Sequence, residues 1–141
     1  MKVFFDTNVL IDAFSNRDEL SVFSEQCYLL VLSKQIKGYI SSNQLMTFYY
    51  VFSKFTNKEF AFESLNQIIN HFEVVPFSKF NVLHSIENNY FDIEDGAQDD
   101  CAKEFCCDFI ITRNTKDFIN SKNKVCTPKE FLELYSAFQN S

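Results

Sequence analysis

Carboxylates that could do chemistry follow apolar runs at separate points of this 141-residue chain. Asp6 comes directly after the apolar residues 3–5, and Asp117 lies a short polar stretch beyond the apolar run 109–111. Between them lies the densest acidic run, residues 92–100. In open parallel α/β sheets ligands bind at the carboxyl ends of strands, so Asp6 is predicted to lie where chemistry usually happens. Clustered carboxylates can hold Mg²⁺ or Mn²⁺, which supply what phosphodiester cleavage needs. The alternative is that Asp6 only caps the helix that follows it.

Three motifs in this order resemble the PIN domain family. They are Phe5-Asp6-Thr7-Asn8, Asp92-x-Glu94-Asp95 before a helix, and Thr112-Arg113-Asn114-x-x-Asp117-Phe118. That family contains metal-dependent ribonucleases, including the toxin components of bacterial toxin–antitoxin pairs. The resemblance covers essentially the whole chain. It implies a single PIN-like domain over residues 1–141 with a three-layer α/β/α architecture and a mainly parallel central sheet.

The resemblance also implies roles for individual residues. Asp6, Asp95 and Asp117 are expected to hold Mg²⁺ or Mn²⁺ and to be the catalytic acids. Asp99 follows Asp95 by four residues, so both lie on one face of the predicted helix, and Asp99 is a further candidate ligand or water-holding group. The neighbouring polar residues expected to orient these ligands or water are Thr7, Asn8, Thr112 and Asn114. The structural alternatives are a favourable acidic first turn for Asp95, a solvated turn for Asp117, and strand-end capping for the polar group.

One position departs from the family pattern. PIN nucleases usually carry another acid, commonly Glu, in the helix after the second strand, but residues 42–51 contain no carboxylate, and Thr47 is expected in that place. Because Asp6, Asp95 and Asp117 balance only three of the four positive charges of two divalent ions, we expect one firmly held metal. A second ion would then be recruited only with RNA. Weak or lost activity would make the chain an RNA- or protein-binding PIN-like module.

Basic residues surround the third motif. Arg113 and Lys116, with Lys122 and Lys124 beyond them, are expected to hold the RNA backbone; the alternative is an unpatterned set of surface charges. The net charge of −6 argues against a generally basic nucleic-acid coat without excluding an RNA substrate. A third function class, aspartate-based phosphoryl transfer, is disfavoured because Asn8 stands where a second carboxylate is usual and no Gly-rich phosphate loop exists.

Apolar runs and helical spacing alternate along the whole chain, which predicts a parallel sheet covered on both faces. Gly38 is predicted to end the second helix in a left-handed conformation, and Thr127-Pro128-x-Glu130 to start the last one with a capping box. The predicted strands are 3–5, 39–41, 72–75, 109–112 and 125–126. The predicted helices are 9–14, 19–36, 43–54, 59–70, 79–89, 95–105 and 128–138.

Composition sets the remaining expectations. With 18 Phe and no Trp the core is expected to be filled largely by Phe. The odd count of 5 Cys indicates buried thiols in a reducing compartment, and no apolar run is long enough to span a membrane, so a cytoplasmic protein is expected. By resemblance alone, an antitoxin protein is a possible partner and a homodimer a possible assembly.

Overall fold

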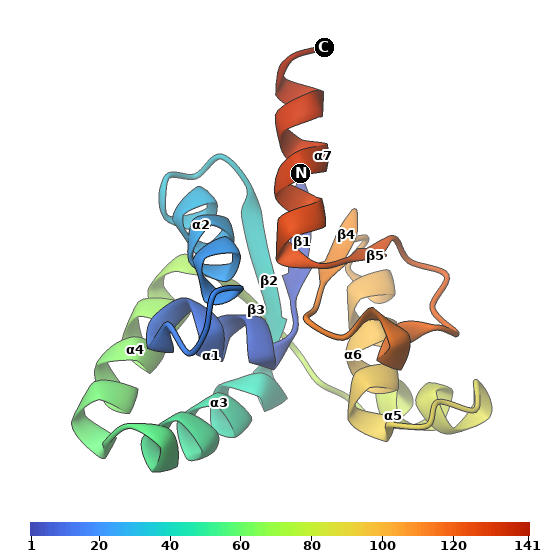
Figure 1. The fold of residues 1–141 in the computed structure, drawn as a ribbon. Coiled ribbons are helices and arrows are strands. Elements are labelled where there is room, and N and C mark those ends of the chain that lie inside the picture. Colours follow the sequence, from blue (N-terminus) through green and yellow to red (C-terminus); the bar gives the residue numbers. More distant parts are fainter.

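The protein is built around one parallel β-sheet, and the computed structural model describes all of residues 1–141 (Figure 1). The sheet has five strands in the order β3-β2-β1-β4-β5, and every neighbouring pair is parallel. The strands are β1 (Lys2–Phe5), β2 (Lys37–Ser41), β3 (Glu73–Val75), β4 (Phe109–Ile111) and β5 (Val125–Cys126). The predicted parallel sheet is confirmed, and β1, with Asp6 at its end, is its central strand.

Helices cover both faces of this sheet. One face carries α1 (Thr7–Ser15), α2 (Ser21–Leu32), α3 (Ser42–Phe55), α4 (Lys58–His71) and α7 (Pro128–Gln139). The other face carries α6 (Ile93–Glu104), with α5 (Lys79–Glu87) packed against it and the short 3₁₀ helix η1 (Thr115–Phe118) beside it. Figure 1 shows the sheet between these two groups, which confirms the three-layer α/β/α architecture.

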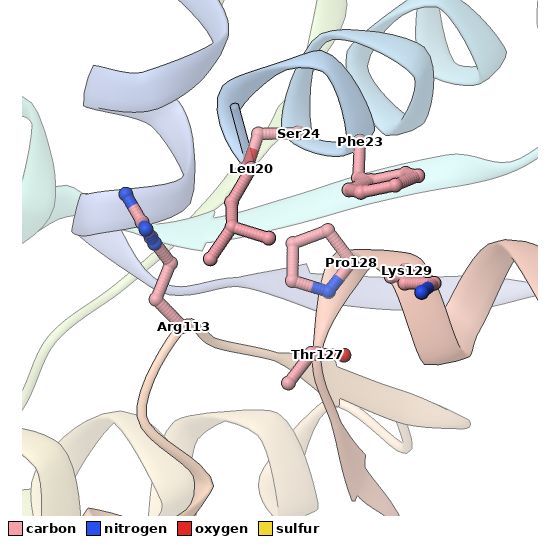
Figure 2. A pocket seen from close by; sticks show the side chains of 7 residues that line it. All are labelled: Leu20, Phe23, Ser24, Arg113, Thr127, Pro128 and Lys129. Carbon is pink, nitrogen blue, oxygen red and sulfur yellow. The ribbon is translucent and has the colours of Figure 1, made fainter. Parts of the chain in front are cut away.

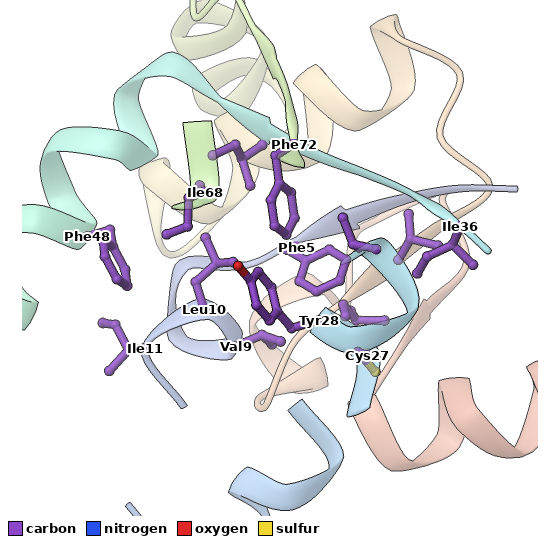
Figure 3. Packing of buried hydrophobic residues seen from close by; sticks show 14 of the residues in the cluster. Phe5, Val9, Leu10, Ile11, Cys27, Tyr28, Ile36, Phe48, Ile68 and Phe72 are labelled. Atoms are coloured by element: carbon purple, nitrogen blue, oxygen red, sulfur yellow. The ribbon is translucent and has the colours of Figure 1, made fainter. Parts of the chain in front are cut away.

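The two cores follow from the alternation of side chains along a strand. Val3 and Phe5 point into the larger core, whereas Phe4 points into the smaller core under α6. Aromatic rings fill much of the larger core (Figure 3): Phe5 meets Phe72 edge-on, with ring centroids 4.9 Å apart. The prediction of a Phe-rich core is confirmed.

Element ends were predicted less well than element types. The second helix ends at Leu32 rather than near residue 36, and Lys34, with φ of 61°, takes the left-handed conformation predicted for Gly38. Gly38 instead lies inside β2 opposite Val3, where a Cβ atom would come within 2.5 Å of the Phe72 ring. The glycine therefore permits close packing rather than a turn. The predicted capping box is confirmed, since Thr127 and Glu130 cap α7 reciprocally.

The cysteines form no disulfide, as expected. Cys27, Cys101 and Cys126 are buried, and burial raises the pKa of the Cys126 thiol to about 12, which makes it unreactive. Cys106 is exposed, so the expectation of buried thiols is wrong for that residue. None of the helices has both the length and the apolar content that crossing a bilayer requires.

Candidate metal centre

Asp6 sits where β1 and β4 end side by side. Its amide donates to the carbonyl of Ile111 at 3.0 Å, so the ladder between the two strands extends one residue beyond β1. The Asp6 side chain is the cap of α1, with Oδ1 accepting from the Thr7 amide at 2.8 Å. Its Oδ2 accepts from the Thr112 hydroxyl at 2.8 Å. Asp6 is therefore a helix cap and a site residue at once, and Thr7 and Thr112 fix both of its oxygens.

The position of Asp6 is electrostatically unfavourable for a carboxylate. The residue is only 7% exposed, and burial raises its pKa to about 6, although the bonds from Thr112 and Thr7 act in the opposite direction. The charges of Glu94 and Asp117 raise the pKa further. Part of the unfavourable energy of Asp6 therefore comes from other acids nearby.

The pKa of the Asp95 carboxyl group is also raised. It lies in the first turn of α6, where its amide donates to the capping carboxylate of Asp92 at 3.1 Å. Burial, and after it the charge of Asp6, raise the pKa of Asp95 to about 8, with smaller contributions from Asp92, Asp117 and Glu94. Interactions between charges weaken with distance and screening, so these acids share one electrostatic environment at the carboxyl edge of the sheet.

Asp117 reaches this edge from the turn that follows β4. It lies on η1, is exposed, and its amide donates to the carbonyl of Asn114 at 3.2 Å. The Asn114 amide in turn donates to the Thr112 hydroxyl oxygen at 3.2 Å. Thr112 thus connects Asp6 to the turn that presents Asp117. The side chains of Asn8 and Asn114 are exposed beside these residues.

The acids suit a hard divalent cation by donor type and by charge. They offer only oxygen atoms, and the raised pKa values of Asp6 and Asp95 mark an excess of negative charge that a cation would relieve. No three His, Cys, Asp or Glu side chains are close enough together to hold a metal ion as they stand. Asp95 is half-buried and Asp117 is exposed, so neither carboxylate is enclosed in the core. The donor set fits Mg²⁺ or Mn²⁺ once these side chains converge.

Asp99, which its spacing predicts as a further ligand or water-holding group, is engaged in hydrogen bonds within the protein. Its oxygens accept hydrogen bonds from the Tyr90 hydroxyl, from the Ser121 hydroxyl at 2.5 Å and from the Asn123 amide at 2.7 Å. Asp99 is a buried structural acceptor that joins α6 to two loops.

Arg113 is likewise engaged inside the protein rather than free to bind RNA. Its guanidinium contacts Asp12 Oδ2 and Asp18 Oδ2, each at 2.9 Å. Asp12 is completely buried and its other oxygen accepts from Arg17 Nε at 2.7 Å. A buried carboxylate of this kind requires its cations, so Arg113 has a structural role here, and its role in substrate binding stays a prediction. Lys116 is exposed and forms no ion pair.

A small cavity of about 110 Å³ lies next to Arg113, between α2 and the start of α7. Figure 2 shows the Arg113 guanidinium turned towards the α1 ribbon, away from the space between Leu20 and Pro128. No carboxylate lines this cavity, so it is not part of the acidic site.

Gln44 is a buried residue of the site region that sequence reasoning missed. Its amide nitrogen donates to the Phe5 carbonyl at 2.7 Å and to the Thr7 hydroxyl at 3.2 Å, which ties α3 to the end of β1. Its amide oxygen caps α3 through the Ser41 amide at 2.7 Å. The pattern Ser41-x-x-Gln44 was the signal that could have indicated it. Thr47, one turn further on, is half-buried, and its hydroxyl donates to the Asn43 carbonyl at 3.4 Å.

Comparisons with known proteins agree with this arrangement. A family model described as PIN domain matches residues 2–116. The chain is 34% identical over 140 residues to the protein named Ribonuclease VapC1 from Aquifex aeolicus, with 96% of each chain covered. It is similar to a solved toxin–antitoxin complex from Klebsiella pneumoniae at 26% identity and a TM-score of 0.66, covering 89% of this chain and 97% of that chain. A DNA-bound VapBC structure from Salmonella typhimurium, at 19% identity, shares the fold with a TM-score of 0.69, covering 91% and 98%.

Proposed function

The chain belongs to the PIN domain family, and from this premise we propose that it is a metal-dependent endoribonuclease that hydrolyses RNA phosphodiester bonds. The observation that carries the proposal is the electrostatic coupling of Asp6, Asp95 and Asp117 at the carboxyl edge of the sheet. A relative at 34% identity that is named a ribonuclease supports the RNA substrate.

Asp6, Asp95 and Asp117 would hold Mg²⁺ or Mn²⁺. A divalent ion at such a site neutralises phosphate charge and activates a water. Thr7 and Thr112 keep both oxygens of Asp6 fixed, so Asp6 offers a preoriented ligand on the rigid central strand. Asp95 and Asp117 come from α6 and η1 and complete the site by turning inward. With Thr47 in the place of the usual acid, these three carboxylates would hold one ion firmly, and RNA would supply the remaining negative charge for a second.

Lys116 is the cation best placed to hold the RNA backbone. It lies next to Asp117 on η1, and it is exposed and forms no ion pair. Its charge can therefore pair with phosphate. Lys122 follows on the same loop. These local cations would offset the net charge of −6 where RNA approaches.

We also propose that the chain is a toxin controlled by an antitoxin protein. The support is the ribonuclease relative and the toxin–antitoxin complex that it resembles at 26% identity. The single-domain organisation over residues 1–141 is proposed as well: the residues beyond the family match include Cys126 and Phe131, which pack into the larger core. Sedimentation of the purified chain tests whether it is the proposed homodimer.

The decisive experiment is cleavage of a single-stranded RNA by the purified protein in Mg²⁺ or Mn²⁺, with EDTA as the first control. Asp6→Ala and Asp95→Ala are expected to abolish cleavage. Glu133→Ala removes an exposed acid on α7 and is expected to leave it unchanged. Cleavage that survives both active-site substitutions, or that proceeds in EDTA, would remove the proposed mechanism.

A second candidate is a catalytically weak module that binds RNA or a protein. The absence of an acid at Thr47 and of three ready-placed metal ligands favours it. Calorimetry separates the two functions: no Mn²⁺ binding, together with unchanged RNA affinity in EDTA, would select the binding module.

A further inference from the structure

Two large apolar side chains that flank the acids in the sequence stand in solvent. Phe91 is fully exposed, at 104% of its reference area, and Ile119 is 83% exposed. Phe91 directly precedes Asp92, the cap of the helix that carries Asp95, and Ile119 lies two residues beyond Asp117. We call this pair the Phe91–Ile119 lip. Burial in the fold does not explain it, since a folded chain gains nothing from a phenyl ring held in water.

The lip is held by the buried carboxylate of Asp99. The Tyr90 hydroxyl, next to Phe91, and the Ser121 hydroxyl, two residues after Ile119, both donate to this carboxylate. A second connection runs from the Asn120 amide to the Asn89 carbonyl at 3.4 Å. The two loops are therefore tied to α6 and to each other, so hydrogen bonds hold the segments that carry Phe91 and Ile119.

The lip also lies close to the acids and to unpaired positive charge. In the chain, Phe91 precedes Asp95 by four residues and Ile119 follows Asp117 by two. Lys116 and Lys122, on either side of Ile119, are exposed and form no ion pair. Exposed apolar surface interleaved with free cations is the composition that binds single-stranded nucleic acid, because rings stack on bases and cations pair with phosphates.

We propose that the Phe91–Ile119 lip is a stacking subsite for an unpaired base next to the scissile phosphate. The base lies on the Phe91 ring, Ile119 contacts its edge, and the adjoining phosphates pair with Lys116 and Lys122. This inference rests on the proposed ribonuclease function and narrows its substrate class. The preferred RNA has single-stranded, unstacked nucleotides at the cleavage point, and a fully paired duplex is a poor substrate.

The chain has no tryptophan, which allows a direct optical test. Phe91→Trp introduces a single fluorophore at the lip, and Asp6→Asn in the same chain with EDTA prevents cleavage. Titration with a short single-stranded RNA is expected to quench this fluorescence by stacking. The matched control is Phe62→Trp, which places tryptophan at another exposed phenylalanine, 66% exposed on α4, at the opposite side of the molecule (Figure 1). Its fluorescence is expected to stay unchanged.

Affinity gives the second measurement. Phe91→Ala is expected to weaken single-stranded RNA binding by about 5- to 150-fold, the range for loss of one base–aromatic stack, while Phe62→Ala leaves it unchanged. An abasic RNA should lose affinity for the wild-type protein but not for Phe91→Ala. Equal quenching at both tryptophans, or unchanged affinity of Phe91→Ala, would refute the subsite. A change in sedimentation of Phe91→Ala without loss of RNA binding would assign the lip to a protein contact instead.

These outcomes separate the subsite from the proposed nuclease function. If wild-type protein fails to cleave RNA but RNA quenches the fluorescence of Phe91→Trp, the stacking subsite is supported and the proposed nuclease function is refuted. If wild-type protein cleaves RNA and Phe91→Ala cleaves single-stranded RNA at the wild-type rate at low RNA concentration, the nuclease function is supported and the stacking subsite is refuted.

Discussion

Replacing Asp6 with asparagine is expected to stabilise the metal-free protein at alkaline pH while destroying metal binding. Asp6 is 7% exposed, and its pKa of about 6, against an ordinary value of 3.8, corresponds to about 3 kcal/mol of unfavourable interaction in the ionised form. Asparagine keeps the acceptor for the Thr7 amide, and the Thr112 hydroxyl can rotate to accept from the new amide nitrogen. The substitution therefore removes the charge and keeps the contacts.

The sign of the pH dependence follows from proton linkage. Folded Asp6 binds its proton more tightly than unfolded Asp6, so ionisation costs stability only in the folded state. That cost is fully present above a pH of about 6 and disappears below a pH of about 4, the ordinary pKa. Asp6→Asn should therefore be about 1–3 kcal/mol more stable than wild type at pH 8 and nearly equal to it at pH 4. Removal of this charge also lowers the pKa of Asp95, which adds to the gain at high pH.

Urea unfolding in EDTA at pH 4, 6 and 8, followed by circular dichroism, measures the free energy of unfolding of both proteins. Saturating Mn²⁺ is then added at pH 8. A ligand at about 100 times its dissociation constant stabilises by about 2.7 kcal/mol, so wild type should recover the difference and the variant should not. Glu133→Gln, an exposed site on α7, is the control for loss of one negative charge. A pH-independent difference, or a less stable Asp6→Asn at pH 8 in EDTA, would refute the electrostatic account of the site.

Four further substitutions test the other assignments. Arg113→Ala leaves the buried Asp12 with only one cation and should cost about 3 kcal/mol of stability, measured by urea unfolding. Lys116→Ala should leave stability unchanged. It should instead reduce the slope of log affinity for RNA against log salt concentration by about 1. Asp99→Ala leaves three donors without their acceptor and should lower the free energy of unfolding by about 2 kcal/mol or more. Because its carboxylate is already engaged by these donors, the variant should still bind Mn²⁺ in calorimetry. Loss of all Mn²⁺ affinity in folded Asp99→Ala would show that Asp99 is a metal ligand. Thr47→Glu supplies the acid usual in the family and should raise Mn²⁺ affinity and the cleavage rate, and unchanged values would show that this position does not face the metal.

Local signals predicted the order and type of the elements. Apolar runs gave the strands, and the Thr127 cap with Pro128 gave the start of α7, because those features depend on residues adjacent in sequence. Gly38 was misread because its small size serves a contact with Phe72, a residue 34 positions away that no local pattern reveals. Element ends failed for the same reason, since packing decides where a helix stops.

The sequence predicted that Asp6 lies at the edge of the sheet, but not which side chains hold it there. Asp6 follows a strand, and its position at the sheet edge follows from topology alone. The internal partners of Asp99 and Arg113 were not predicted, because helical spacing and proximity in sequence do not show which partners a side chain finds. Asp99 met donors from two loops, and Arg113 met the buried Asp12. A polar side chain is free for a ligand only when the fold leaves it unused, and that depends on tertiary contacts.

The loss of an acid at Thr47 alters the balance of the whole site. In the proposed site a fourth carboxylate at Thr47 would add repulsion to a cluster in which the pKa of Asp95 is already about 8. Without that acid, the proposed ligands Asp6, Asp95 and Asp117 would be one charge short of neutralising two divalent cations. An RNA phosphate carries that missing charge, so substrate binding and occupancy by a second cation become thermodynamically linked, each strengthening the other. The cleavage rate should therefore depend on Mn²⁺ concentration more steeply than metal binding does in protein without RNA.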